Sequence, residues 1–165
     1  MDREAKKEEI LKSEEQTREL EKEVPKEIQL IHAELSAEVF ARYRQTPCFG
    51  RCPVYTITIL KDGKAFFEGE NFVDHEGEYK GAVSKEERMQ LREIANEIRF
   101  FEMASIYDNK NVTDLPSIIT TLALEEGGHK TVINRYGGPE TMREIEKYFQ
   151  ELVKNIQWKR KVEQE

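Results

Sequence analysis

A chain of 165 residues with a formal net charge of −7 has the length of one domain with extensions, and is too short for two ordinary domains. The negative charge disfavours nucleic acid as a partner, because each phosphate contact needs a cation and the overall field repels a polyanion. Charged residues make up 36% of the chain, and no run approaches the roughly 18 apolar residues of a membrane span, so we expect a soluble protein without one.

Composition divides the chain into three parts. Residues 1–36 are dense in mixed charge and predict a charged helical leader or tether, 37–157 carry the apolar patterns of an α+β domain, and 158–165 form a charged tail. Pro25 suits the first turn of a helix in the leader, with an apolar stripe of Ile28, Ile31 and Leu35. Such a stripe can dock on a partner, so self-association through the N-terminal helices is one hypothesis.

The start of the chain bears on the compartment. MDREAKKEEILKSEEQ has no apolar core after a basic segment, so it predicts no signal peptide. As written, the protein is expected to be soluble and cytoplasmic. It would be periplasmic or lipid-anchored if a signal segment had been removed.

The first half of the domain predicts three strands. Weak alternation begins at Val39, and β-branched and aromatic residues predict a second strand over 54–60. Asp62-Gly63 is a strong hairpin signal, because glycine accepts a positive φ, and it leads into a third strand over 65–68. The polar, glycine-punctuated segment 69–81 predicts a loop with a short edge strand around Tyr79.

The second half predicts a helix, a hairpin and a last helix. Ser84 and Glu87 form a capping box, and Gly127-Gly128 joins two further strands. Gly138-Pro139 opens the last helix, whose apolar face holds Met142, Ile145, Phe149, Leu152, Val153 and Ile156. This order predicts an α+β two-layer sandwich, with a mainly antiparallel sheet of about five strands and two helices on one face.

A turn with two cysteines lies between the first two strands. Pro47 and Pro53 stiffen its ends, and Gly50 can take the positive φ that reverses the chain. Only a folded-back turn brings the Cα atoms of Cys48 and Cys52 within the distance of about 7 Å that a disulfide requires. Its composition favours such a turn.

The chemistry of the cysteine pair has four interpretations. The pair is a structural disulfide, two free thiols with a packing role, a redox-active dithiol in which Arg51 stabilises a thiolate, or part of a metal site. A zinc site needs four ligands, and the histidines are scattered at positions 32, 75 and 129. No metal, cofactor or catalytic residue is predicted, since the chain has no phosphate-binding loop, dinucleotide fingerprint or nucleophile elbow.

The residues around this turn resemble an uncharacterised bacterial family of domains of unknown function, marked by a Cys-Phe-Gly-x-Cys-Pro signature. The resemblance covers roughly Val39 to Val153. It is carried by Thr46 to Tyr55, Asp62-Gly63, Phe67-Glu68-Gly69, Tyr107, Asp114-Leu115-Pro116 and the Gly-Gly-x-Lys hairpin that ends at Lys130. The resemblance implies no assigned activity, many exported or lipid-anchored members, and particular interest in Cys48, Cys52, Pro53, Tyr55 and Asp114.

The sequence therefore predicts a non-enzymatic binding module for an unknown protein or small ligand. The candidate recognition rim combines the cysteine turn with the loops from Tyr107 to Ser117, and its residues are Phe49, Arg51, Pro53, Tyr55, Tyr107 and Asp114. The alternative is a thiol-disulfide redox protein that uses Cys48 and Cys52.

Overall fold

The computed structural model describes residues 3–12 and 24–161, and the chain forms two compact units, Met1–Leu35 and Ser36–Glu165. The first unit contains a helix over residues 3–12 and helix α2 (Lys26–Glu34). Helix α2 begins directly after Pro25, as the sequence predicts, because proline tolerates the first turn of a helix.

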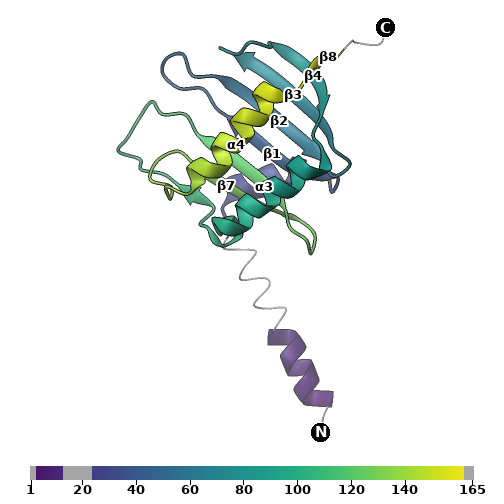
Figure 1. Cartoon of the computed structure of the whole chain (residues 1–165). Helices are drawn as coiled ribbons and strands as arrows, with labels where there is room; N and C mark the ends of the chain where they lie inside the picture. The colour runs from purple at the N-terminus through teal and green to yellow at the C-terminus, as the bar shows by residue number, and fades with distance from the viewer. Residues whose placement is uncertain (1–2, 13–23, 162–165) are drawn as a thin grey trace. The chain divides into compact units, whose positions relative to one another are not determined.

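The second unit is built on one mixed sheet, in which the strands follow the order β5-β7-β6-β1-β2-β3-β4-β8 (Figure 1). Every neighbouring pair is antiparallel except β5 and β7, which are parallel. The strands are β1 (Val39–Gln45), β2 (Val54–Leu60), β3 (Lys64–Asn71), β4 (Gly77–Ala82), β5 (Ile106–Tyr107), β6 (Ile118–Ala123), β7 (His129–Asn134) and β8 (Lys159–Arg160).

The predicted sheet of about five strands with two helices is wrong, although the class is α+β overall. The described residues form eight strands and four helices, the two of the first unit included. Strands β5 and β8 have two residues each, too few to show a period-two pattern. Strand β4 contains two glycines and mostly exposed side chains, so its pairing with β3, not its own composition, keeps it extended.

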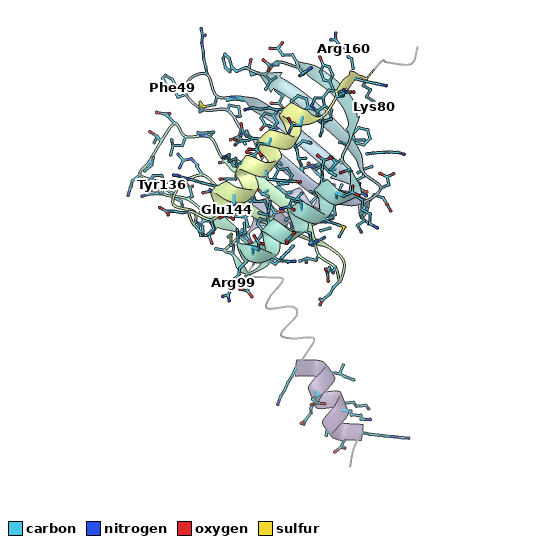
Figure 2. The ribbon with its side chains drawn as sticks, viewed as in Figure 1. Phe49, Lys80, Arg99, Tyr136, Glu144 and Arg160 are labelled. Atoms are coloured by element: carbon cyan, nitrogen blue, oxygen red, sulfur yellow. A yellow bond between two sulfur atoms is a disulfide. The ribbon has the colours of Figure 1, made fainter. Side chains whose placement is uncertain are left out.

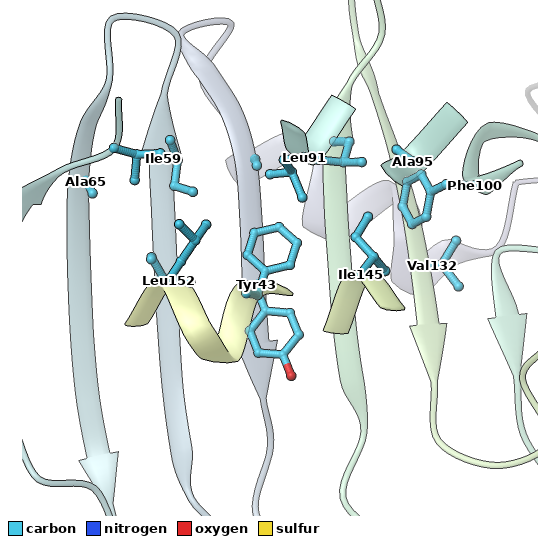
Figure 3. Close-up of a cluster of buried hydrophobic side chains, with 14 of the residues drawn as sticks. Tyr43, Ile59, Ala65, Leu91, Ala95, Phe100, Val132, Ile145 and Leu152 are labelled. Carbon is cyan, nitrogen blue, oxygen red and sulfur yellow. The ribbon is translucent and has the colours of Figure 1, made fainter. Parts of the chain in front are cut away.

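Helices α3 (Lys85–Glu97) and α4 (Met142–Asn155) pack on the same face of this sheet (Figure 1). Alternate strand residues such as Ala41, Tyr43, Ile57 and Ile59 point toward them and are fully buried, as the pleat of a strand requires. Figure 3 shows Tyr43 in the middle of this cluster, between side chains of both helices. The ring of Tyr43 stacks on that of Phe149, with centroids 4.9 Å apart.

Helices α3 and α4 begin in different ways. Ser84 and Glu87 form the predicted capping box, in which each side chain bonds the other residue's backbone amide. Helix α4 begins at Met142, later than Gly138-Pro139 suggests, because residues 139–141 form a turn in which the Met142 amide donates to the Pro139 carbonyl at 3.0 Å. The 3-10 turn η1 (Phe100–Glu102) follows α3 and buries Phe100.

Four connections meet at one end of the sheet. Gln45 pairs with both Tyr55 and Ile118, and Ile118 pairs with Asn134, so the chain leaves the sheet there after β1, before β6 and after β7. The β3–β4 connection lies at the same end, because Tyr55 pairs with Gly69 and Gly69 with Gly77. This end therefore gathers the segments 46–53, 72–76, 108–117 and 135–141.

Candidate functional site

The cysteine loop, residues 46–53, is closed by a disulfide between Cys48 and Cys52, whose Cα atoms are 5.7 Å apart. Gly50 has a φ of 144° and its amide donates to the Cys48 carbonyl at 3.1 Å, so glycine makes the reversal inside the ring. Phe49 stands at the tip with 87% of its surface exposed, beside the disulfide in Figure 2. Arg51 is exposed as well.

The cysteine loop is fastened to the segment 108–117. The Thr46 amide donates to the Ser117 carbonyl at 3.0 Å, and the Ser117 amide donates to Thr46 Oγ1 at 2.7 Å. The Phe49 amide donates to the carbonyl of Asp114 at 3.4 Å, and Asp114 has a φ of 67°. Asp114 thus supports the cysteine loop through its backbone, whereas its side chain is exposed.

Arg135 holds the other side of the 108–117 segment. Its guanidinium donates to Asp108 Oδ1 at 2.5 Å and to the carbonyls of Asn109 and Val112. The hydrogen bond from Arg135 lowers the pKa of the Asp108 carboxyl. The neighbouring loops thus form one braced surface that exposes the apolar side chains of Phe49, Leu115 and Tyr136, which we call the loop rim.

Tyr107 lies apart from the cysteine loop. It belongs to the edge strand β5, and strands β7 and β6 separate that strand from β1. Its hydroxyl accepts a hydrogen bond from the Ala104 amide at 3.0 Å, and its ring packs against the core. The side chain of Tyr107 therefore orders the β5 edge, while its backbone carbonyl accepts from Arg135 and Tyr136.

Directly behind the cysteine loop, Pro53 and Tyr55 line a cavity of about 560 Å³, which we call the aromatic pocket. Its floor is a row of rings: Tyr55 stacks on Phe67 with centroids 5.4 Å apart, and Phe67 lies 5.2 Å from Trp158. The indole of Trp158 is fixed because its Nε1 donates to the Val153 carbonyl at 2.9 Å. The other lining residues are Gln45, Phe72, Val73, Asp74, His75, Gln150, Val153, Lys154 and Ile156.

One end of the pocket is polar. The hydroxyl of Tyr43 accepts hydrogen bonds from Gln45 Nε2 at 2.7 Å and from Gln150 Nε2 at 3.1 Å. Burial raises the pKa of the Tyr43 phenol, and burial together with the neighbouring Tyr43 raises the pKa of Tyr55. Both phenols therefore stay un-ionised at neutral pH.

The segment 72–76 forms a wall of the pocket because of Gly69. A Cβ on Gly69 would lie 1.9 Å from the carbonyl oxygen of His75, so only glycine lets this segment fold back over β3. Gly81 likewise allows close packing, since a Cβ there would lie 2.4 Å from Cγ2 of Ile156, which lines the pocket. The sequence predicts a polar, glycine-punctuated loop here and misses the pocket.

Helix α4 carries a buried carboxyl group that the sequence did not predict. Glu146 is only 6% exposed, and Asn134 Nδ2 donates to its Oε2 at 3.3 Å. Burial raises the pKa of the Glu146 carboxyl. The sequence contains an indication of this burial, because position 146 lies on the apolar face of the helix between Ile145 and Phe149.

We expect Glu146→Gln to stabilise the protein at neutral pH. The folded-state pKa of Glu146 lies above its unfolded value, so the folded state binds more protons between the two values, and stability falls as pH rises through that window. The gain of the variant over the wild type should shrink as pH falls and vanish below the unfolded pKa. Urea unfolding from pH 3 to pH 8 measures it, and a pH-independent difference would contradict it.

No group of three or more His, Cys, Asp or Glu side chains lies close enough to hold a metal ion within residues 3–12 and 24–161. In the same residues no helix has both the length and the apolar character needed to cross a bilayer.

Comparison with known proteins gives one match. Neither the search of curated proteins nor the search of solved structures found a significant match. A family model described as a domain of unknown function (DUF6438) matches residues 40–153, which run from β1 into the last turns of α4 and include the cysteine loop. The chain therefore belongs to this family of domains of unknown function.

Proposed function

We propose that the domain is a non-enzymatic binding module that recognises a protein partner through the loop rim. The observation that carries this proposal is Phe49, a large apolar side chain that is 87% exposed at the tip of a disulfide-closed loop. Aromatic anchors of this kind supply much of the energy of protein interfaces, and an exposed one has a cost in water.

The bracing of the rim supports the same proposal. The disulfide and the bonds from Thr46 and Phe49 to Ser117 and Asp114 hold the cysteine loop in one arrangement before any partner arrives. A loop that is already ordered loses less conformational entropy on binding, so more of the contact energy appears as affinity. Leu115 and Tyr136 are further apolar side chains that the rim exposes.

The redox alternative has less support. In thioredoxin-like proteins a helix N-terminus lowers the pKa of the reactive thiol, whereas here Cys52 is followed by Pro53 and strand β2. The cysteine signature is, in our proposal, the device that presents Phe49.

Site-specific photo-cross-linking tests the proposal. A photoreactive phenylalanine analogue is placed at position 49, and in a matched control at position 89, where Met89 is 62% exposed on α3. We expect one protein to be captured at 49 and not at 89. The captured protein, once purified, should bind Phe49→Ala at least about tenfold more weakly than the wild type and Met89→Ala equally well. Equal capture at both positions, or an unchanged affinity of Phe49→Ala, would refute a recognition role for the rim.

A further inference from the structure

We propose that the aromatic pocket binds a small uncharged molecule in which a flat apolar ring carries a carboxamide group. This site is additional to the loop rim, since the residues that would contact the molecule lie on β1, β2, β3, the β3–β4 connection, α4 and the segment that follows α4. The two sites touch only at Pro53, which follows the cysteine loop and lines the pocket.

The size and the walls of the pocket suit a ring. A volume of about 560 Å³ lies within the range of about 300–1,000 Å³ that is usual for small-molecule sites. The floor formed by Tyr55, Phe67 and Trp158 is rigid, because Tyr55 and Phe67 are 6% and 2% exposed and the indole is tied to Val153. Aromatic side chains prefer a ring partner in an offset or edge-on arrangement, so a pocket lined by several aromatic side chains suits a flat ring.

The polar end of the pocket suits a carboxamide. Gln45 and Gln150 each use one N–H on the Tyr43 hydroxyl, so each amide keeps one N–H donor and its carbonyl acceptor for a ligand. A carboxamide carries a donor and an acceptor on one planar group, so it can pair with both the N–H donors and the carbonyl acceptors of the two glutamines. A ligand that left these half-buried groups unpaired would incur their desolvation cost.

Charge argues for a neutral occupant. The lining residues at the polar end are two glutamines and Tyr55, whose phenol is un-ionised, so a ligand carboxylate placed there would lose its hydration without gaining a counter-charge. The nearby Glu146 carboxyl also disfavours a negative charge at the Tyr43 hydroxyl. The lining residues with ionisable groups outside this end are Asp74, His75 and Lys154, all exposed, and the full charges of Asp74 and Lys154 cancel.

Fluorescence of Trp158 provides a direct assay, because it is the only tryptophan in the chain and lines the pocket. N-acetyl-L-phenylalaninamide is the probe, since its phenyl ring does not absorb at wavelengths that excite tryptophan. We expect a saturable change in Trp158 emission in the millimolar range. The matched acid, N-acetyl-L-phenylalanine, should bind at least about tenfold more weakly, and maltose should leave the emission unchanged.

A pair of glutamine variants tests the role of the amide. Gln150→Leu should weaken binding of the probe about tenfold by removing one donor and one acceptor, whereas Gln90→Leu, the same change on an exposed position of α3, should not. Should Gln150→Leu not fold, saturation transfer in the wild type replaces it, and the ring of the probe should exchange magnetisation with the methyl groups of Val153 and Ile156.

Three results would each overturn the proposal: no saturable signal from the wild type, equal affinity for the acid and the amide, or equal binding by Gln150→Leu and Gln90→Leu. These results would not bear on the rim proposal, which is tested independently. Phe49→Ala should retain binding of the probe, because Phe49 does not line the pocket.

Discussion

Replacing Phe149 by alanine should lower the free energy of unfolding by about 3–5 kcal/mol. The side chain is fully buried, and its ring stacks on Tyr43 at an interplanar angle of 14°. Tyr43 belongs to β1, which has paired strands on both sides, so the substitution opens a cavity between α4 and the middle of the sheet. The loss is a large share of the roughly 5–15 kcal/mol that stabilises a typical domain.

Urea unfolding, followed by circular dichroism and by Trp158 emission, measures this loss. Met89→Ala is the control, because truncation of an exposed side chain usually changes stability by less than about 0.5 kcal/mol. A loss below about 1.5 kcal/mol for Phe149→Ala would show that α4 is held to the sheet chiefly by other contacts.

Gly69→Ala should destabilise the protein by about 1–3 kcal/mol and displace the segment 72–76. The new methyl group would meet the backbone carbonyl of His75, and a backbone atom cannot move aside by changing a rotamer. The same substitution at Gly81 should cost less, since the nearest atoms there belong to the side chains of Ile156 and Trp158.

Limited proteolysis detects the displacement of the segment 72–76, and urea unfolding gives the loss of stability. Glu68→Ala, at the exposed neighbouring position of β3, is the control for an added alanine in that strand. If Gly69→Ala and Glu68→Ala were equally stable and equally resistant to protease, the pocket wall would not depend on the missing side chain.

Local signals in the sequence identified the elements whose cause is local. The capping box at Ser84, the Asp62-Gly63 hairpin and the β-branched run 54–60 each arise from residues a few positions apart, and the structure has them where predicted. Strand β4 depends on its pairing with β3, and β5 and β8 depend on partners far along the chain. Lys159 and Arg160 have a composition typical of a charged tail, yet they pair with Lys80 and Tyr79.

The same distinction between local and long-range causes separates the cysteine loop from the aromatic pocket. The cysteine loop could be recognised because its prolines, glycine and cysteines lie within a few consecutive residues. The aromatic pocket could not, because Gln45, Phe67, Gln150 and Trp158 come together only when the sheet and α4 are assembled. Gly69 carries no usable signal, since it lies in β3 and the atom that requires glycine there, the carbonyl oxygen of His75, belongs to the connection that follows the strand.

The strand order also has a consequence for the order of folding. Strands β1 to β4 pair through short connections, but β1 must wait for β6, whose residue Leu122 pairs with Ala41 about 80 positions earlier. Helix α4, which covers the apolar face over Tyr43, comes later still. During synthesis from the N-terminus, the meander would expose that face and one edge of β1 until the ribosome has made nearly the whole domain. Slow translation of the last third of the chain would therefore favour aggregation over folding.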